Sequence, residues 1–338
     1  MRKTATTLED LAKLAGVSIS TASRALNDSP AVNKRTKQTI WKLARELDYP
    51  FRHYMPAGPI GAEGTIAIIV PRPQGREIHF SDPFFLELFA GVGEAARERG
   101  CDFLVSHIAP TKFDDISEAM NTSRADGMIF LGQSSLHAAF NRLAQTEARF
   151  VVWGAQLPDQ IYCSIGSDNV LGGRRATSHL TRLGRRRIVF LGDTEGAPEA
   201  AQRLRGYYDA LEQAGIKADP DLIAPAHFEA ESAEASIGSL IHRGIAFDAV
   251  FAASDLIAMG AVRALKEAGR SIPGDVSVVG YDDLPFSRFA SPALSTISQD
   301  TAKAGRLLVS KLLDAGGEKA RRSERIPTEL IIRESCGG

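Results

Sequence analysis

The chain contains seven short apolar segments, each the length of a buried strand, separated by longer segments with helical periodicity. The apolar segments start with TIAIIV at 65–70 and recur at 101–107, 126–132, 149–154, 186–192, 247–254 and 275–283. Helical patterns stand between them, notably at 83–100, 169–184, 202–215 and 255–269. Apolar strands that alternate with helices are typical of parallel sheets covered on both faces. The pattern predicts two doubly wound α/β lobes that bind ligands at the carboxyl ends of their strands.

The composition excludes several other kinds of protein. A hydrophobic fraction of 44% is too high for a disordered chain, and no apolar run is long enough to span a membrane. The N-terminus MRKTATTLED lacks the apolar region of a secretory signal. The three cysteines show no CxxC spacing, which favours a reduced chain over a disulfide or zinc framework. We therefore expect a cytoplasmic protein without a metal site or cofactor.

Charge is divided unevenly along the chain. The whole sequence has a net charge of −1, which by itself argues against a nucleic-acid partner. Residues 1–58, however, contain ten basic and five acidic residues, whereas the remaining 280 contain 30 basic and 36 acidic ones. A basic segment joined to an acidic body indicates a nucleic-acid-binding head.

Residues 7–48 predict three helices. TLEDLAKL is capped by Thr7 and ends at Gly16, Ser18 caps a second helix at 19–26, and Asn33 caps a third at 34–48. Two short helices joined by a Gly-Val turn and braced by a third describe a helix-turn-helix.

The start of the second helix in such a motif enters the DNA major groove. We expect Ile19, Ser20 and Arg24 to face outward, and Arg24 to read guanine or hold a phosphate. The other expected DNA contacts are helix-terminal or flanking polar residues: Thr7, Ser18, Thr21, Asn27, Asn33, Thr36, Lys37 and Tyr49. The alternative is a small helical domain whose basic face is only solvated.

TLEDLAKLAGVSISTASRALN and VNKRTKQTIWKLARELDYP resemble the DNA-binding head of the LacI/GalR family of bacterial repressors, without a gap from Thr7 to Tyr49. The resemblance implies that Ile19, Ser20 and Arg24 occupy the recognition positions. It also implies a division into a helix-turn-helix domain at 1–49, a hinge or linker at 50–64, and an effector-binding and dimerisation core at 65–338. The expected N-lobe comprises about 65–165 and 298–325, and the C-lobe about 166–297 and 326–338.

The hinge departs from the family pattern. Relatives usually carry a segment of the type PNxxARxL, whose helix wedges a leucine into the minor groove. This chain reads PFRHYMPAGPIGAEG at 50–64, with Gly58 where the leucine is expected. Two interpretations follow: a shorter hinge with Met55 or Ile60 as the wedge, or a flexible linker.

The predicted strand ends indicate what the core binds. They carry aromatic rings, carboxylates and a serine: Asp82, Phe84, Phe85, Trp153, Ser254, Asp255 and Asp282. Arg203 is expected to open the helix at 202–215 and to reach the same crevice. Aromatic faces stack on sugar rings, and charged groups bond their hydroxyls. The rings are equally good core residues, and Asp255 is also placed to cap the helix that follows it.

SIGSDNVLGG, AAQRLRGYYDALEQAGI and IPGDVSVVGYDDLPFSRFASPALSTISQD extend the resemblance to the family's core, which is similar to periplasmic sugar-binding proteins. By this correspondence Arg203, Asp282 and Gln299 contact the effector, SDPFF implicates Asp82 and Phe84, and Ser254 replaces a common asparagine. The absence of a leucine-heptad tail favours a homodimer over a tetramer.

The sequence motifs do not indicate an enzyme. GVGEAA at 91–96 resembles a dinucleotide fingerprint but lies inside a predicted helix, where it cannot follow a strand. No GxxxxGK[ST], HExxH or GxSxG motif occurs, and the seven histidines are scattered. We expect no catalytic residues.

These patterns predict a sequence-specific, homodimeric repressor of a carbohydrate-utilisation operon. It would bind a palindromic operator, and a small-molecule effector between the lobes would control its affinity. The cleft residues favour a sugar as the effector, with a glucoside as the candidate, although purines are the effectors of some members of the family. The alternative function is a module that binds a sugar or purine and whose head does not act on DNA.

Overall fold

The computed structural model describes residues 7–26, 29, 31–46, 64–72, 82–122, 125–193, 197–314 and 322–337. Two predicted DNA contacts, Asn27 and Tyr49, and the segment 50–63 lie outside these residues. Among the described residues, no helix is both long enough and apolar enough to cross a membrane.

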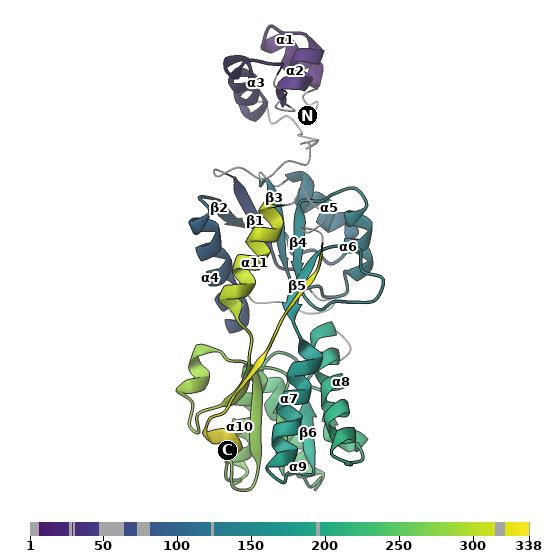
Figure 1. Cartoon of the computed structure of the whole chain (residues 1–338), viewed down its shortest axis with the longest axis vertical. Helices are drawn as coiled ribbons and strands as arrows, with labels where there is room; N and C mark the ends of the chain where they lie inside the picture. The colour runs from purple at the N-terminus through teal and green to yellow at the C-terminus, as the bar shows by residue number, and fades with distance from the viewer. Residues whose placement is uncertain are drawn as a thin grey trace.

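The head consists of three helices, α1 (Leu8–Leu14), α2 (Ile19–Leu26) and α3 (Lys34–Glu46) (Figure 1). A reciprocal capping box starts α1: Thr7 Oγ1 accepts from the Asp10 backbone at 3.2 Å, and Asp10 Oδ2 accepts from the Thr7 backbone at 2.8 Å. Gly16 turns the chain from α1 to α2 with a φ of +64°, a conformation that favours glycine. Leu11, Ala22 and Ile40 are fully buried between the helices. The predicted helix-turn-helix is confirmed.

The N-lobe contains a six-stranded parallel sheet in the order β11-β5-β4-β3-β1-β2. Its strands are β1 (Thr65–Ile69), β2 (Asp102–Val105), β3 (Gly127–Leu131), β4 (Phe150–Trp153), β5 (Ser164–Ser167) and β11 (Glu324–Ile326). Its helices are α4 (Pro83–Glu98), α5 (Phe113–Thr122), α6 (His137–Ala144) and α11 (Thr301–Leu313). Ile66 and Ile68 of β1 pack with α4 and α11 on one face, and Ala67 and Ile69 pack on the other. Burial on both faces explains why this strand is apolar without alternation.

The C-lobe repeats the plan in the order β12-β10-β9-β8-β6-β7, parallel except for the antiparallel pair β10–β12. Its strands are β6 (Ile188–Leu191), β7 (Ile223–Ala224), β8 (Ala249–Ala252), β9 (Ser277–Asp282), β10 (Ser295–Ser298) and β12 (Glu329–Ile331). Its helices are α7 (Asn169–Arg182), α8 (Pro198–Gln213), α9 (Ala230–His242) and α10 (Asp255–Glu267). The α/β two-lobed core predicted from the sequence is confirmed.

Three crossings of the chain connect the lobes. They lie between β5 and α7, between β10 and α11, and between β11 and β12. In Figure 1 α11, drawn in yellow-green, lies in the N-lobe beside α4, and the last strands run back to the C-lobe. Each lobe is therefore built from segments that are far apart in the sequence.

Glycines allow two pairs of helices to approach closely. A Cβ on Gly91 of α4 would meet the backbone oxygen of Thr301, and one on Gly305 of α11 would meet the backbone of Gly91. The GVGEAA segment lies within α4, so its first glycine serves helix packing. In the C-lobe, Gly206 of α8 faces the backbone of Val170 in α7 in the same way.

One predicted boundary is wrong. The sequence pattern placed the start of α8 at 202, with Arg203 opening the helix, but α8 begins at Pro198. Proline suits the first turn of a helix because the missing N–H would have no partner there. Arg203 therefore lies in the second turn.

We predict that Gly206→Ala destabilises the core by about 1–3 kcal/mol, because the added methyl group clashes with backbone atoms that have no room to move. Gly238→Ala is the matched control, since Gly238 lies within α9 and nothing surrounds its Cβ position. That change is expected to stabilise by about 0.5–1 kcal/mol. Denaturant unfolding of both variants checks the prediction, and an equal effect of the two would contradict it.

Candidate functional site

The second helix of the head, α2, presents an exposed face. Ser18 caps this helix: its Oγ accepts from the Thr21 backbone at 3.1 Å and lies 2.9 Å from Ser20 Oγ. Ile19 is 48% exposed, and Ser20 and Arg24 are also exposed. The three residues predicted to meet base edges therefore face solvent from one short helix.

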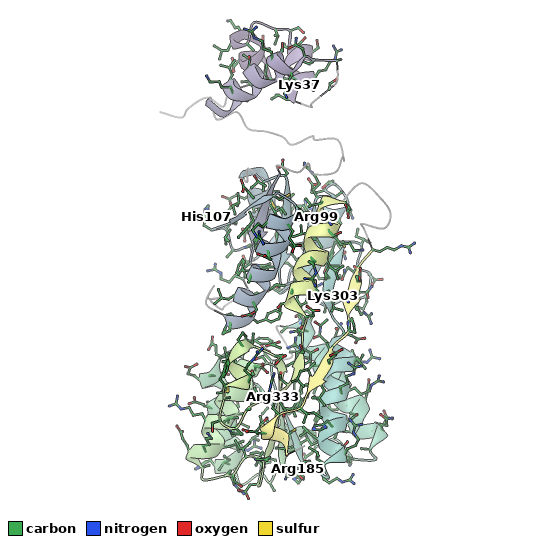
Figure 2. All side chains as sticks on the ribbon, turned by 60° about the vertical axis from the view of Figure 1, so that its left-hand side comes forward. Lys37, Arg99, His107, Arg185, Lys303 and Arg333 are labelled. Carbon is green, nitrogen blue, oxygen red and sulfur yellow. The ribbon has the colours of Figure 1, made fainter. Side chains whose placement is uncertain are left out.

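The third helix supplies polar groups next to this face. Asn33 Oδ1 accepts from the Thr36 backbone at 2.8 Å, which makes Asn33 the cap of α3. Thr36 and Lys37 follow in the first turn, half-buried, and Figure 2 shows Lys37 in the head. The side chain of Thr7 is likewise engaged in capping α1. Helix N-termini of this kind present backbone N–H groups that bind phosphate.

A cavity of about 310 Å³ lies between the two lobes of the core. This volume is at the lower end of the range for small-molecule sites. Eight of the nine residues predicted to contact an effector line it: Asp82, Phe84, Phe85, Trp153, Arg203, Ser254, Asp282 and Gln299. Sheets whose strands end towards the same gap bring these side chains together.

The N-lobe wall of the cleft is aromatic. The ring centroids of Phe84 and Trp153 lie 5.9 Å apart, and those of Phe84 and Phe85 lie 6.0 Å apart. Trp153 is only 5% exposed and belongs to the core of the lobe, whereas the two phenylalanines are half-buried. The tryptophan therefore both fills the core and borders the cleft.

A buried guanidinium organises the C-lobe wall. Arg203 Nε donates to Asn169 Oδ1 at 2.9 Å, and Nη1 donates to the carbonyl oxygen of Ala253. The guanidinium carbon lies 3.7 Å above the ring centroid of Tyr281. Asp282 Oδ1 is 4.0 Å from Nη1. Both charges are buried, and the pair is held by neighbours on α7, at the end of β8 and on β9.

Asp282 is a carboxyl group in a strongly perturbed environment. Burial raises the pKa of Asp282 well above its ordinary value, while the Arg203 charge and the hydrogen bond from Gln299 oppose the change. Gln299 Nε2 donates to its Oδ1 at 2.6 Å. Burial also raises the pKa of Asp82, although its Oδ1 accepts from the Phe84 backbone at 2.9 Å. The two carboxyl groups enter the cleft from opposite lobes.

Comparisons with known proteins identify the chain. Residues 7–50 match the model of bacterial regulatory proteins of the lacI family, and residues 177–336 match a periplasmic binding protein-like domain. The regulator CelR of Thermobifida fusca is 31% identical over 99% of both chains. The ribose operon repressor of Haemophilus influenzae is 31% identical over 98% of this chain and 96% of its own. A solved complex of CelR with cellobiose aligns with a TM-score of 0.69 at 32% identity, covering 98% of this chain and 99% of that one.

The chain belongs to the LacI family. The family members matched are transcriptional regulators, which confirms that this chain is a regulator and not an enzyme.

In this LacI-family core, Asp255 does not line the cleft, although the sequence placed it among the effector contacts. It is completely buried and accepts from the Leu284 backbone at 2.8 Å, from Ser287 Oγ at 2.6 Å and from Thr296 Oγ1 at 2.5 Å. Burial raises the pKa of Asp255 to about 6. The side chain holds the loop after β9, and Ser254, not Asp255, caps α10.

Asp283 also points away from the cleft. It pairs with Arg333 at 2.6 Å, which Figure 2 shows in the C-lobe. Asp282 and Asp283 both have positive φ values, +120° and +59°, a conformation that is uncommon for residues other than glycine. This turn sends two sequential carboxylates to different places, which explains why only Asp282 reaches the cleft.

The sequence reasoning missed several polar residues of the cleft wall: Gln133, Ser134, Ser167, Asn169, Glu199, His227 and Glu229. Gln133 and Ser134 directly follow the predicted strand 126–132, so the strand-end criterion would have found them. Ser167 ends a strand that is too polar to be predicted, and the glutamates lie on or before helices. Their places depend on tertiary structure.

The lobes also contact each other beside the cleft. The Ala155 backbone N–H of the N-lobe donates to Glu199 Oε1 of α8 at 3.2 Å. Gln202 Nε2 of the same helix donates to the carbonyl oxygen of Gln156 at 3.0 Å. Backbone groups of two adjacent residues, Ala155 and Gln156, thus connect the segment after β4 to the first turns of α8.

We predict that Arg203→Met lowers the free energy of unfolding by about 3–5 kcal/mol at pH 7, because it leaves Asp282 buried without its compensating charge. The loss is expected to be smaller at pH 5. A carboxyl group whose pKa is raised in the folded state binds its proton more tightly when folded. The free-energy cost of burying the ionised carboxylate of Asp282 therefore decreases as the pH falls and the group is protonated.

The double variant Arg203→Met/Asp282→Asn is expected to recover part of the loss at pH 7, since the uncompensated charge is gone. Denaturant unfolding at both pH values measures the effect. A double variant less stable than Arg203→Met at pH 7 would argue against a coupled pair.

Proposed function

We propose that the chain is a cytoplasmic, homodimeric transcriptional repressor that binds a palindromic operator through one head per half-site. The observation that carries this proposal is the exposed face of α2, on which Ile19 and Ser20 of the first turn and Arg24 of the last turn stand free of the head's core. In a helix-turn-helix this surface reads base edges in the major groove. The surplus of positive charge in residues 1–58 favours attraction to phosphates, and the acidic body does not adhere to DNA.

Dimerisation has support in the exposed surface of the N-lobe. β2 is the edge strand of its sheet, and Phe103 and Val105 on it are 46% and 47% exposed. Leu86 on the adjacent α4 is 52% exposed. Neighbouring exposed apolar side chains of this kind mark association surfaces. A twofold dimer also matches the symmetry of a palindromic operator.

The effector in this proposal is an uncharged sugar, with a glucoside such as cellobiose as the candidate. The cleft offers an aromatic wall on the N-lobe side and carboxylates with one arginine on the C-lobe side. The solved complex of the relative CelR contains cellobiose. Two relatives that share the fold across the whole chain thus point to carbohydrates, the other being the ribose operon repressor.

Effector and operator are coupled through the lobes. A ligand that contacts Asp82 and Asp282 together favours one relative position of the lobes, and a change in that position alters the spacing of the two heads of the proposed dimer. The coupling is reciprocal, and the usual coupling free energy of about 1–3 kcal/mol corresponds to a change in affinity of roughly 5–150-fold.

We predict that Arg24→Ala weakens operator binding by at least about tenfold while effector binding is unchanged, because a base or phosphate contact is lost. Arg243→Ala is the control. It removes the same charge from the end of α9, where Arg243 pairs with Asp221 at 2.9 Å on the surface. Fluorescence anisotropy with labelled operator DNA at several salt concentrations measures both. Wild-type affinity must fall steeply as salt rises; a flat response would favour a head that does not act on DNA.

We predict that an uncharged sugar raises the melting temperature of the full chain, since a ligand bound only by the native state stabilises it. A thermal-shift panel of cellobiose, glucose, galactose, ribose, adenosine and guanosine checks this. A shift produced by a nucleoside and by none of the sugars would contradict the sugar assignment. Adding the active sugar to the anisotropy assay then shows whether it strengthens or weakens operator binding.

A further inference from the structure

Three buried polar atoms on the N-lobe wall of the cleft have no hydrogen-bond partner within the described part of the protein. They are Gln133 Oε1, Ser134 Oγ and Ser167 Oγ, and all three residues line the cleft. The side chain of Gln133 is completely buried. Buried polar atoms in native proteins are nearly always bonded. Their grouping on one wall indicates that a ligand supplies the missing partners.

The amide of Gln133 is held in one orientation. Its Nε2 donates to the carbonyl oxygen of Ala155 at 2.6 Å and to the hydroxyl of Tyr162 at 2.7 Å. A carbonyl oxygen only accepts, so the amide nitrogen must face Ala155. The atom that remains for a ligand is consequently Oε1, which is an acceptor and not a donor.

A second layer fixes the direction of this arrangement. His137 Nε2 lies 3.1 Å from the carbonyl oxygen of Pro158, and its Nδ1 lies 3.0 Å from the Tyr162 hydroxyl. A carbonyl oxygen only accepts, so Nε2 carries a proton. The Tyr162 oxygen accepts from Gln133 Nε2 at 2.7 Å. These contacts hold Tyr162 in place, and Tyr162 in turn holds the amide of Gln133 with Oε1 left over.

Gly154 provides the space in which the amide lies. A Cβ at this position would clash with the Cγ and Cδ atoms of Gln133. The amide is thus packed against the backbone at the end of β4, one residue before the peptide group that contacts Glu199. Both packing and hydrogen bonds restrict it to one position.

The rest of the cleft also presents mainly acceptors. Four carboxylates line it, from Asp82, Glu199, Glu229 and Asp282. The guanidinium of Arg203 is engaged by Asn169 and Ala253. An anionic ligand would meet these four acidic side chains against the single guanidinium of Arg203 in a poorly hydrated space, which disfavours it relative to a neutral ligand. A ligand that is rich in hydroxyl donors and carries no negative charge is therefore complementary to this cleft.

We propose that Gln133 is a specificity-determining residue for the effector: its Oε1 accepts a hydrogen bond from a hydroxyl group of an uncharged polyhydroxylated ligand. Tyr162 is the positioning residue that holds the amide. The inference rests on the proposed control of the protein by a sugar in this cleft, and it adds which atom selects the sugar and why phosphorylated or oxidised sugars are rejected.

The test uses the full chain and isothermal titration calorimetry with cellobiose, glucose, galactose and ribose, and with gluconate, glucose 6-phosphate and ribose 5-phosphate. We expect at least one neutral sugar to bind and its anionic counterparts to bind at least about tenfold more weakly. Gln133→Met is expected to lose about tenfold or more in affinity for that sugar, since one bond to a buried acceptor is removed. Tyr162→Phe should lose less, because the bond from Gln133 to Ala155 remains.

Monodeoxy forms of the binding sugar separate recognition from general disturbance of the fold. In the wild type, one of them should bind at least about fivefold more weakly than the parent sugar. In Gln133→Met the ratio of the affinity for the parent sugar to that for this deoxy sugar, the deoxy ratio, should fall to about one. In Tyr162→Phe the deoxy ratio should be smaller than in the wild type. Thr177→Val is the matched control: it removes a buried unpartnered hydroxyl that does not line the cleft, so both affinities should remain.

Three results would overturn the inference. They are equal sugar affinity of Gln133→Met and wild type, an anionic counterpart that binds as tightly as the neutral sugar, and an unchanged deoxy ratio in Gln133→Met. If Gln133→Met does not fold, the deoxy ratio of Tyr162→Phe decides, and an unchanged ratio counts against the proposal. Binding of a neutral sugar by every variant leaves the proposed function intact, whereas a panel in which nothing binds the wild type contradicts both.

Discussion

Parallel strand order determines where the core can bind a ligand. Parallel strands end at the same edge of their sheet, and the connections between them cover both faces with helices. The two sheets of this chain end towards each other, so the residues after β3, β4, β8 and β9 form opposite walls of one cleft. The aromatic wall, the buried arginine and the amide of Gln133 all follow from this placement.

The cleft is polar, yet few of its charged groups are free. Arg203 is bonded to Asn169 and to the end of β8, Asp282 to Gln299, and Glu199 to the Ala155 backbone. Such bonds lower the cost of keeping charges in a poorly hydrated space and fix their positions. A ligand therefore meets a prearranged set of groups. One of these groups, Glu199, belongs to the C-lobe and is bonded by the N-lobe, so the ligand site and the lobe contact share atoms.

Sequence reasoning predicted the elements whose own residues carry the signal. The strand 65–70 is apolar on both faces, and the capping residues Thr7, Ser18 and Asn33 mark the ends of the head's helices. It did not predict β5, with the sequence SIGS, or β10, with the sequence STIS. These strands are buried because neighbouring strands and helices cover them, and their small polar residues give no periodic signal.

The residues of the candidate site could likewise be predicted only in part. Residues that follow strong strands, such as Trp153 and Asp282, were predicted at the cleft and lie there. Asp255 also follows a predicted strand, but its carboxylate accepts hydrogen bonds from three donors between residues 284 and 296 and does not reach the cleft. Gln133 directly follows the predicted strand 126–132, so its place at the cleft could have been predicted, but the orientation of its amide depends on Tyr162, 29 residues further along the chain.

The close crossing of α7 and α8 has a consequence for how this site can change. Gly173 and Gly206 let the two helix backbones touch, and the backbone carbonyl that Gly173 faces is that of Arg203. The distance between Asn169 on α7 and Arg203 on α8 is therefore fixed by two residues that lack side chains and do not border the cleft. Redesign for another effector has freedom at the lining residues, but both glycines must stay. In a library that randomised every position near Arg203, including Gly173 and Gly206, most variants would have misplaced helices.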